Sequence, residues 1–385
     1  MDGGTAHDYV PDNNDFYYLH RIRLNITLTP VKGLTIFVQP QHTEAPGFRA
    51  PVLPSVEDRV DFRAATVEYS TAGPVKWAVK AGRQELNFGA QRLIGSANWG
   101  NTSRGYDGVR FSREDPGLRL DLFFSTVLQT RQYELDRWRN DIQLHGFHAS
   151  SKTWVKRGLL ELYAFRKISK RDPGEPGRTG RSDHYTVGAR GVGKLPRRLD
   201  YNFETAVQAG DLGGMPHRGW AGYWILGYRI RAQESAPRLI ANFSHASGDR
   251  TPGDGRYATF DQLFPTNHQF YGYANRVSWR NMNEAMAGLD WRPYSRMIVN
   301  FQYHSVWLAT RRDAFYNFNG RPQARNPNAS SNHLWQEFDI NAVWDLRPDL
   351  QFTLGFTHIF PGTYIRESTR GASVTAPYLQ WRYTF

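Results

Sequence analysis

The chain has 385 residues, no cysteine and a formal net charge of +12, from 48 Lys and Arg against 36 Asp and Glu. Lack of cysteine excludes a disulfide framework, a zinc–thiolate site and a thiol nucleophile, and 14% aromatic residues is too many for a disordered protein. The mean hydropathy is −0.61 and no apolar run approaches the ~18 residues of a membrane helix, which excludes a helical membrane protein.

Predicted strands follow one another along the chain from Phe16 onward. In the first, over Phe16–Leu28, apolar residues such as Ile22 and Leu24 alternate with polar residues such as Arg21. Further alternating segments lie at 118–125, 297–304, 337–344, 351–356 and 376–385. A period of two residues is typical of strands with one apolar and one polar face.

Turn signals join these strands in pairs. Short turns are predicted at 30–33, 72–74, 115–117, 195–198, 234–237, 292–296 and 346–349, with a weaker one at 150–156. Longer polar stretches lie at 46–58, 88–104, 169–182, 211–218, 249–274, 311–332 and 361–373. Short turns at one end and long loops at the other indicate the periplasmic and extracellular ends of an outer-membrane β-barrel. Tryptophans beside them fit the two aromatic girdles: Trp77, Trp154, Trp291 and Trp344 at short turns, Trp220 and Trp307 at long loops.

The predicted fold is therefore all-β, a transmembrane antiparallel β-barrel with about 17 strands in this chain. The first and last predicted strands both run toward the periplasmic end, so antiparallel closure needs one more strand between them. We expect the full-length protein to have about 18 strands, the first of them missing upstream. Residues 1–15 would then belong to the first extracellular loop, and residues 16–385 would form the barrel. The first ten residues lack the features of a signal peptide, so we expect a mature or truncated start.

One run in the chain is especially distinctive, TFDQLFPTNH at Thr259–His268. Shorter runs accompany it: Gly82–Leu86, Ser247–Asp249, Tyr271–Tyr273, Tyr303–Leu308, Arg311–Asn317, Gln336–Asp339 and Tyr378–Gln380. In these runs the chain resembles the alginate export family of outer-membrane proteins, from about residue 16 to its end. The resemblance implies a wide barrel with a strongly basic lumen that passes an anionic polysaccharide.

The inner wall of the barrel should carry many charges if the apolar face of each strand meets lipid. The side chains expected to line the lumen and contact substrate are Arg21, Arg23, Lys80, Arg110, Arg119, Arg190, Arg229, Arg231, Arg382, Glu204, Glu337 and Asp339. Arginine suits a polyuronate because its planar guanidinium meets carboxylates in a bidentate manner and stays charged. The alternative is that these charges pair across neighbouring strands and only maintain the shape of the barrel.

The predicted loop at 249–274 is too long and too aromatic to be a simple connection. We expect it to fold into the mouth of the barrel and narrow the pore. The expected constriction residues are Phe260, Asp261, Phe264, His268 and Tyr271. The alternative is an external loop that packs on its neighbours.

The expected function is a bacterial outer-membrane channel that passes an alginate-like polyuronate by passive diffusion. Its expected partners are outer-membrane lipid, lipopolysaccharide and periplasmic export machinery. Two alternatives remain: a general or small-organic-anion porin, and a structural or adhesive barrel with a plugged lumen. No enzyme activity, cofactor or metal is expected, since HExxH and GxSxG motifs are absent and Leu195 replaces the Ser or Thr of a phosphate loop. The basic residues are dispersed rather than clustered, so nucleic acid is not an expected partner.

Overall fold

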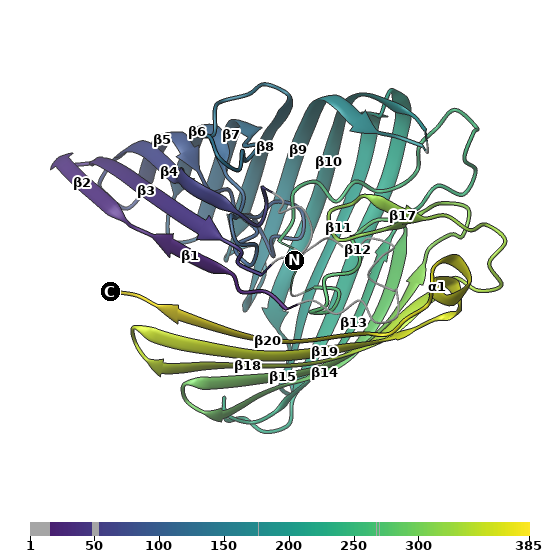
Figure 1. Ribbon diagram of the computed structural model, residues 1–385. Coiled ribbons are helices and arrows are strands. Elements are labelled where there is room, and N and C mark those ends of the chain that lie inside the picture. Colours follow the sequence, from purple (N-terminus) through teal and green to yellow (C-terminus); the bar gives the residue numbers. More distant parts are fainter. Residues whose placement is uncertain (1–15, 48–53, 176, 267, 269) are drawn as a thin grey trace.

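The computed structural model describes residues 16–47, 54–175, 177–266, 268 and 270–385 (Figure 1). One antiparallel sheet of 18 strands dominates it and curves round from β1 to β20. The predicted N-terminal segment 1–15 lies outside the described residues. Among the residues described, no helix has both the length and the apolar character needed to cross a membrane.

Consecutive strands of the sheet pair with each other in chain order. The first part of the sheet consists of β1 (His20–Arg23), β2 (Ile26–Val31), β3 (Leu34–Glu44), β4 (Asp58–Ser70), β5 (Lys76–Gln84), β6 (Tyr106–Glu114), β7 (Leu118–Val127), β8 (Ile142–Ser151) and β9 (Gly158–Pro173). The second part consists of β10 (Thr179–Lys194), β11 (Leu199–Leu212), β12 (Met215–Arg229), β13 (Arg238–Ala246), β14 (Met282–Tyr294), β15 (Met297–Leu308), β18 (His333–Arg347), β19 (Leu350–Pro361) and β20 (Val374–Tyr383). A hairpin of β16 (Phe315–Tyr316) and β17 (Pro322–Ala324) and a short helix, α1 (Thr363–Ser368), lie in the long loops.

The strands β1 and β2 are two halves of one strand of the barrel wall. We call each such full-length strand of the wall a stave. Both pair with β3, and only Leu24 and Asn25 separate them. Counting them once turns the 18 strands of the sheet into 17 staves, which confirms the predicted number. Within the described part of the chain β20 pairs with β19, and no pairing joins it to β1 or β2. These are the two free edges of the sheet in Figure 1.

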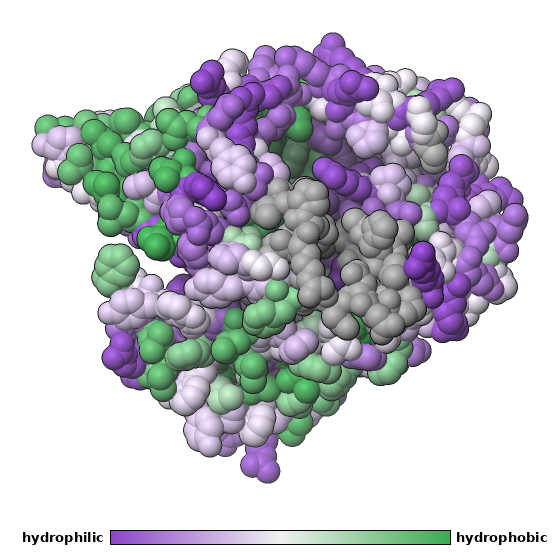
Figure 2. Space-filling model, viewed as in Figure 1, coloured by the Kyte–Doolittle hydropathy of each residue, from purple (hydrophilic) through white to green (hydrophobic). Residues whose placement is uncertain are grey.

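The outward faces of the strands are apolar, as the alternating pattern predicts. Exposed outward residues include Leu28, Val67, Phe124, Phe243 and Leu379. Figure 2 shows hydrophobic surface gathered over β2 and β3 and over β18 to β20, whereas the surface near α1 and β17 is mainly hydrophilic. The predicted girdle tryptophans at the short turns are all exposed: Trp77, Trp154, Trp291 and Trp344.

The prediction of two of the long loops is wrong, because in the structure these stretches are mostly strand with a short connection. The stretch 169–182 contains the end of β9 and the start of β10, which leaves only a short connection between them. The stretch 211–218 is a tight turn at Gly213–Gly214, where both residues have positive φ, 62° and 78°. Beyond the apolar band both faces of a strand meet water, so the alternating pattern disappears while the backbone pairing continues.

Candidate functional site

Two long loops fold into the barrel and form an inner layer. We call residues 85–105, between β5 and β6, the first inner loop, and residues 247–281, between β13 and β14, the second inner loop. A parallel bridge between Ile94 and Phe264 joins the two loops. The Phe264 N–H donates to the Leu93 carbonyl at 2.8 Å, and the Gly95 N–H donates to the Phe264 carbonyl at 2.9 Å. The two loops therefore behave as one unit.

An aromatic core holds this inner layer against the strands. The ring of Phe88 in the first inner loop stacks on Phe123 of β7, with centroids 5.1 Å apart. The rings of Phe260 and Trp279, both fully buried, meet edge to face at 5.5 Å. The predicted constriction residue Tyr271 also belongs to this core. The wall and the loops thus share a packed interior at the long-loop end.

The second inner loop is tied to the wall by a buried ion pair. Asp261, a predicted constriction residue, lies 2.8 Å from the ammonium group of Lys167 on β9, and both are buried. Asp261 also exchanges two hydrogen bonds with Gln208 of β11: its N–H donates to the side-chain oxygen at 2.8 Å, and its carbonyl accepts from the side-chain amide at 2.7 Å. Burial alone would raise the pKa of Asp261, but the charges of Lys167, Arg280 and His184 outweigh it and hold that pKa well below its usual range.

A second anchor joins the same loop to β18. The N–H of Tyr273 donates to the carboxylate of Asp339 at 3.1 Å, and the N–H of Ala274 donates to Glu337 at 2.8 Å. Both carboxylates are fully buried. The two acids predicted to contact substrate therefore also hold the inner loop. The loop approaches Glu337 so closely because Gly272 has no side chain and adopts φ +95°.

Replacing Gly272 with alanine is expected to loosen the second inner loop. The new Cβ would lie 2.3 Å from Glu337, and the backbone conformation already disfavours a side chain. We expect a cost of about 1–3 kcal/mol and faster hydrogen exchange at the amides of Tyr273 and Ala274. Gly253→Ala in the same loop is the control, since Gly253 has a similar φ of +96° but a Cβ added there would meet no atom within 4 Å. Equal exchange in the two variants would show that contact with Glu337 does not matter.

Four of the nine predicted basic lumen residues form ion pairs with a carboxylate on the same strand or on a neighbouring one. Lys80 lies 2.6 Å from Glu68, and Arg119 lies 2.7 Å from Asp121. The other members of this paired set are Arg110 with Asp121 and Arg190 with Glu161. For these residues the structure favours the role of maintaining barrel shape. The predicted lumen acid Glu204 is buried as well and accepts a hydrogen bond from Tyr163 at 2.8 Å.

Arg21 and Arg23 on β1 differ from this paired set because their partners are neutral. Arg21 donates to the carbonyl oxygens of Asn98 and Gly100 in the first inner loop, both at 3.0 Å. Arg23 donates to the hydroxyl of Ser103 in the same loop at 2.7 Å. In the part of the chain that the structure describes, neither guanidinium forms a salt bridge with a carboxylate. The two charges are fixed in position by hydrogen bonds to neutral oxygens rather than by direct contact with a carboxylate.

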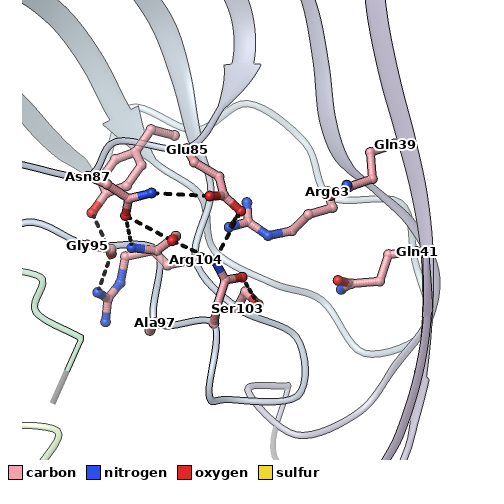
Figure 3. A network of polar contacts seen from close by, with 12 residues as sticks. Gln39, Gln41, Arg63, Glu85, Asn87, Gly95, Ala97, Ser103 and Arg104 are labelled. Atoms are coloured by element: carbon pink, nitrogen blue, oxygen red, sulfur yellow. Dashed lines mark hydrogen bonds and ion pairs between the residues drawn. The ribbon is translucent and has the colours of Figure 1, made fainter. Parts of the chain in front are cut away.

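Two further arginines, which the alternating pattern did not identify, extend this group. Arg104 of the first inner loop donates to the carbonyls of Gly95 and Pro265, at 3.1 and 2.9 Å. Arg63 of β4 pairs with Glu85 at 2.8 Å. Figure 3 shows Arg63 and Glu85 turned toward each other, with Gln39 and Gln41 of β3 beside Arg63 and Ser103 and Arg104 on the loop side. We call Arg21, Arg23, Arg63 and Arg104 the basic cluster; Glu85 is the carboxylate that pairs with it.

The position of Arg63 follows from a bulge next to Pro40. The pairing of β3 with β4 passes from Gln39–Ala64 to Pro40–Phe62, so Arg63 is an extra residue in its strand. Proline has no N–H to donate to the ladder, and a bulge is a usual way to accommodate it. Pro40, between the predicted turn at 30–33 and the predicted loop at 46–58, was therefore the signal that could have indicated the bulge and Arg63.

The remaining predicted site residues lie apart from the basic cluster or on the edge strand. Arg229 donates to the carbonyls of Glu234 and Ala236 at the short-turn end. Arg231 lies beyond the end of β12 and is exposed, and Arg382 lies on β20 and is also exposed. His268 stacks on Trp99 of the first inner loop, with ring centroids 3.5 Å apart.

Comparison with known proteins gives a family match and a set of similar folds. The protein-family model for alginate export matches residues 11–378. No curated protein matches the sequence. A BenF-like porin from Pseudomonas fluorescens Pf-5 has a TM-score of 0.61 and 10% identity over 98% of this chain and 95% of that one. Pseudomonas aeruginosa OccK3 (OpdO) has a TM-score of 0.56 and 12% identity over 95% and 90% of the two chains, and at such identities the likeness establishes the fold alone.

Proposed function

Because this chain belongs to the alginate export family and forms an integral β-barrel channel of the outer membrane, we propose that it passes an anionic polysaccharide of the alginate type by passive diffusion. In the proposal the polymer is a polyuronate, with one carboxylate on each sugar. The barrel lies in outer-membrane lipid, and the proposed neighbours of its two ends are lipopolysaccharide outside and export machinery in the periplasm.

The main support for this proposal is the excess of positive charge in the basic cluster. Arg21, Arg23 and Arg104 all donate to carbonyl or hydroxyl oxygens, and Glu85 pairs with Arg63. Neutral acceptors orient a guanidinium without cancelling its field, so the charge remains available to an anion. The paired residues on β5 to β10 do not offer such a field.

The arrangement also suits transport rather than tight binding. Arg21 and Arg23 are held by the first inner loop, so a passing carboxylate meets guanidiniums that are already positioned. A charged wall raises the local concentration of anions, and several moderate sites in series let a polyanion both enter and leave. Small organic anions would benefit from the same field, which makes a small-anion porin the competing proposal.

Replacing Arg21 and Arg23 together with serine should lower the preference for anions. We expect the anion-to-cation permeability ratio, measured from reversal potentials in planar bilayers, to fall by roughly tenfold, the lower end of what charged clefts confer. Lys80→Gln combined with Glu68→Gln is the matched control, because it removes two opposite charges 2.6 Å apart and leaves the net charge of the wall unchanged.

The same bilayer experiment separates the competing functions. Block of the current by oligouronates, weakened in the serine variant, supports the polysaccharide channel. Normal anion current without such block supports a small-anion porin. No current from correctly folded protein would mean that the inner loops plug the barrel, which is the structural alternative.

A further inference from the structure

A group of metal-binding side chains lies where β1 meets β3, outside the lumen. It consists of His20, His42 and Glu44, whose ligand atoms all lie within 4.8 Å of one another. The Nε2 atom of His42 lies 3.5 Å from one carboxylate oxygen of Glu44, and the Nε2 atom of His20 lies 3.8 Å from the other. These side chains are separate from the basic cluster, whose guanidiniums turn toward the first inner loop.

The register of the two strands places this group on the outer face of the barrel. His20 pairs with Glu44, and Ile22 pairs with His42, so the three side chains share a face with Ile22. Ile22 is 59% exposed and belongs to the apolar outer surface, whereas the alternate residue Arg21 reaches the first inner loop. Since β1 and β2 run toward the short turn after Val31, the group lies at the extracellular rim.

We propose that His20, His42 and Glu44 bind a divalent transition-metal ion of the Zn²⁺ class. Imidazole nitrogen and carboxylate oxygen are ordinary zinc ligands, and two ligands of one tetrahedral zinc are roughly 3.4 Å apart. The separations of 3.5 and 3.8 Å need only small side-chain adjustments to reach this value. A water molecule or an anionic group at the rim would complete the tetrahedron.

The other nitrogen of the His42 ring supports this assignment. Its Nδ1 atom lies at hydrogen-bond distance from the carbonyl oxygen of Arg59. A carbonyl can only accept, so Nδ1 is the donating nitrogen and Nε2 is the nitrogen left to bind a metal ion. Such a hydrogen bond from the second nitrogen is the usual support of a histidine that binds a metal. The guanidinium of Arg59 lies 3.9 Å from Glu44, but it also lies 3.6 Å from Glu57 and its side chain is 61% exposed.

A metal ion in this position would cross-link β1 to β3. β1 has only four residues and, in the described part of the chain, pairs with β3 alone. One ligand comes from β1 and two from β3, so the ion would link the strands across the pair. Ligands that bind the folded state alone stabilise it by mass action, so the metal should raise the thermal stability of the barrel.

The test is binding of Zn²⁺ alone to the folded, chelator-treated protein in detergent, measured by equilibrium dialysis. We expect one ion per chain, a rise in the unfolding temperature, and a tetrahedral absorption spectrum when Co²⁺ replaces Zn²⁺. The double variant His20→Ala/His42→Ala should weaken binding by more than about 100-fold, beyond the 10- to 100-fold that changes in outer-shell partners usually cause. His358→Ala is the control; His358 lies on β19 and its ring bonds to Thr375.

The proposal is overturned by the absence of saturable binding near one ion per chain, or by unchanged binding in the double variant. If the double variant does not fold, as judged by its migration on unheated gels, Glu44→Gln replaces it. This variant keeps the size of the side chain and should lower zinc affinity and alter the Co²⁺ spectrum. Unchanged affinity in Glu44→Gln would also overturn the proposal.

Discussion

Replacement of Lys167 with methionine is expected to release the second inner loop from the barrel wall and to raise the single-channel conductance. The variant leaves Asp261 buried without the ammonium group that lies 2.8 Å away. Removal of one partner from a buried ion pair usually costs about 3–5 kcal/mol. This energy would shift the docking equilibrium of the loop by a factor on the order of 10² to 10⁴. Faster hydrogen exchange at the amide of Asp261 should accompany the rise in conductance.

Lys170→Met on the same strand is the control for this experiment. Lys170 also pairs with an aspartate, Asp141 at 3.1 Å, but its side chain is 66% exposed. Exposed pairs contribute between zero and about 1 kcal/mol, so conductance and exchange should stay near their original values. If Lys167→Met behaves like Lys170→Met, the ion pair does not hold the loop.

The ion pair of Asp261 with Lys167 also determines how the docking of the second inner loop should depend on pH. The pKa of Asp261 in the folded protein lies below its unfolded value, so this carboxylate contributes stability at every pH above about 4. That contribution is lost only as the pH falls further, through the depressed pKa. Channel closure or opening near neutral pH would therefore have another cause.

Replacement of His304 with leucine should destabilise the whole barrel. The ring of His304 is fully buried between two carboxylates: Nδ1 lies 2.6 Å from Glu284 and Nε2 lies 3.4 Å from Asp339. A ring that donates from both nitrogens is an imidazolium, so the variant removes the cation that the two buried acids share. We expect the free energy of unfolding to fall by about 3–5 kcal/mol in urea titrations followed by tryptophan fluorescence.

His145→Leu is the matched control for His304→Leu. His145 pairs in register with the exposed Phe124, and its ring bonds only to the amide of Gln143 at 3.0 Å among the described residues. This substitution on the outer face should change the stability by less than about 0.5 kcal/mol. Adding Asp339→Asn to His304→Leu should recover part of the loss, because one buried charge is removed. Equal stability of His304→Leu and His145→Leu would contradict a structural role for the imidazolium.

The barrel itself could be predicted from the sequence because each stave repeats a local rule. An apolar residue at every second position is required wherever one face meets lipid, and 338–344 and 376–385 follow this rule without reference to any neighbour. The rule fails beyond the lipid, which is why the ends of β9 and β10 were predicted as loop. It also gives no information about bulges, so Arg63 was missed.

The interior could be predicted only in part because it depends on contacts between distant segments. Glu337 and Asp339 were correctly placed on the inner face by alternation, yet their partners are backbone groups of a loop some 60 residues away in sequence, 63 for Ala274 and 66 for Tyr273. The stretch 88–104 looked like a polar connection, although Phe88, Leu93 and Ile94 are buried. Apolar residues inside a long loop were the available signal that it packs inward.

The bridge between Ile94 and Phe264 constrains how the two inner loops can change during evolution or engineering. Backbone hydrogen bonds tie 91–95 to 264–266 in fixed register, including one from Thr266 to Gln91 at 2.8 Å. An insertion in either loop between its anchor on the wall and this bridge would shift that register and misplace the aromatic core. The lengths of the two loops must therefore vary together. A graft that transfers a new specificity into this barrel should exchange both loops as a pair.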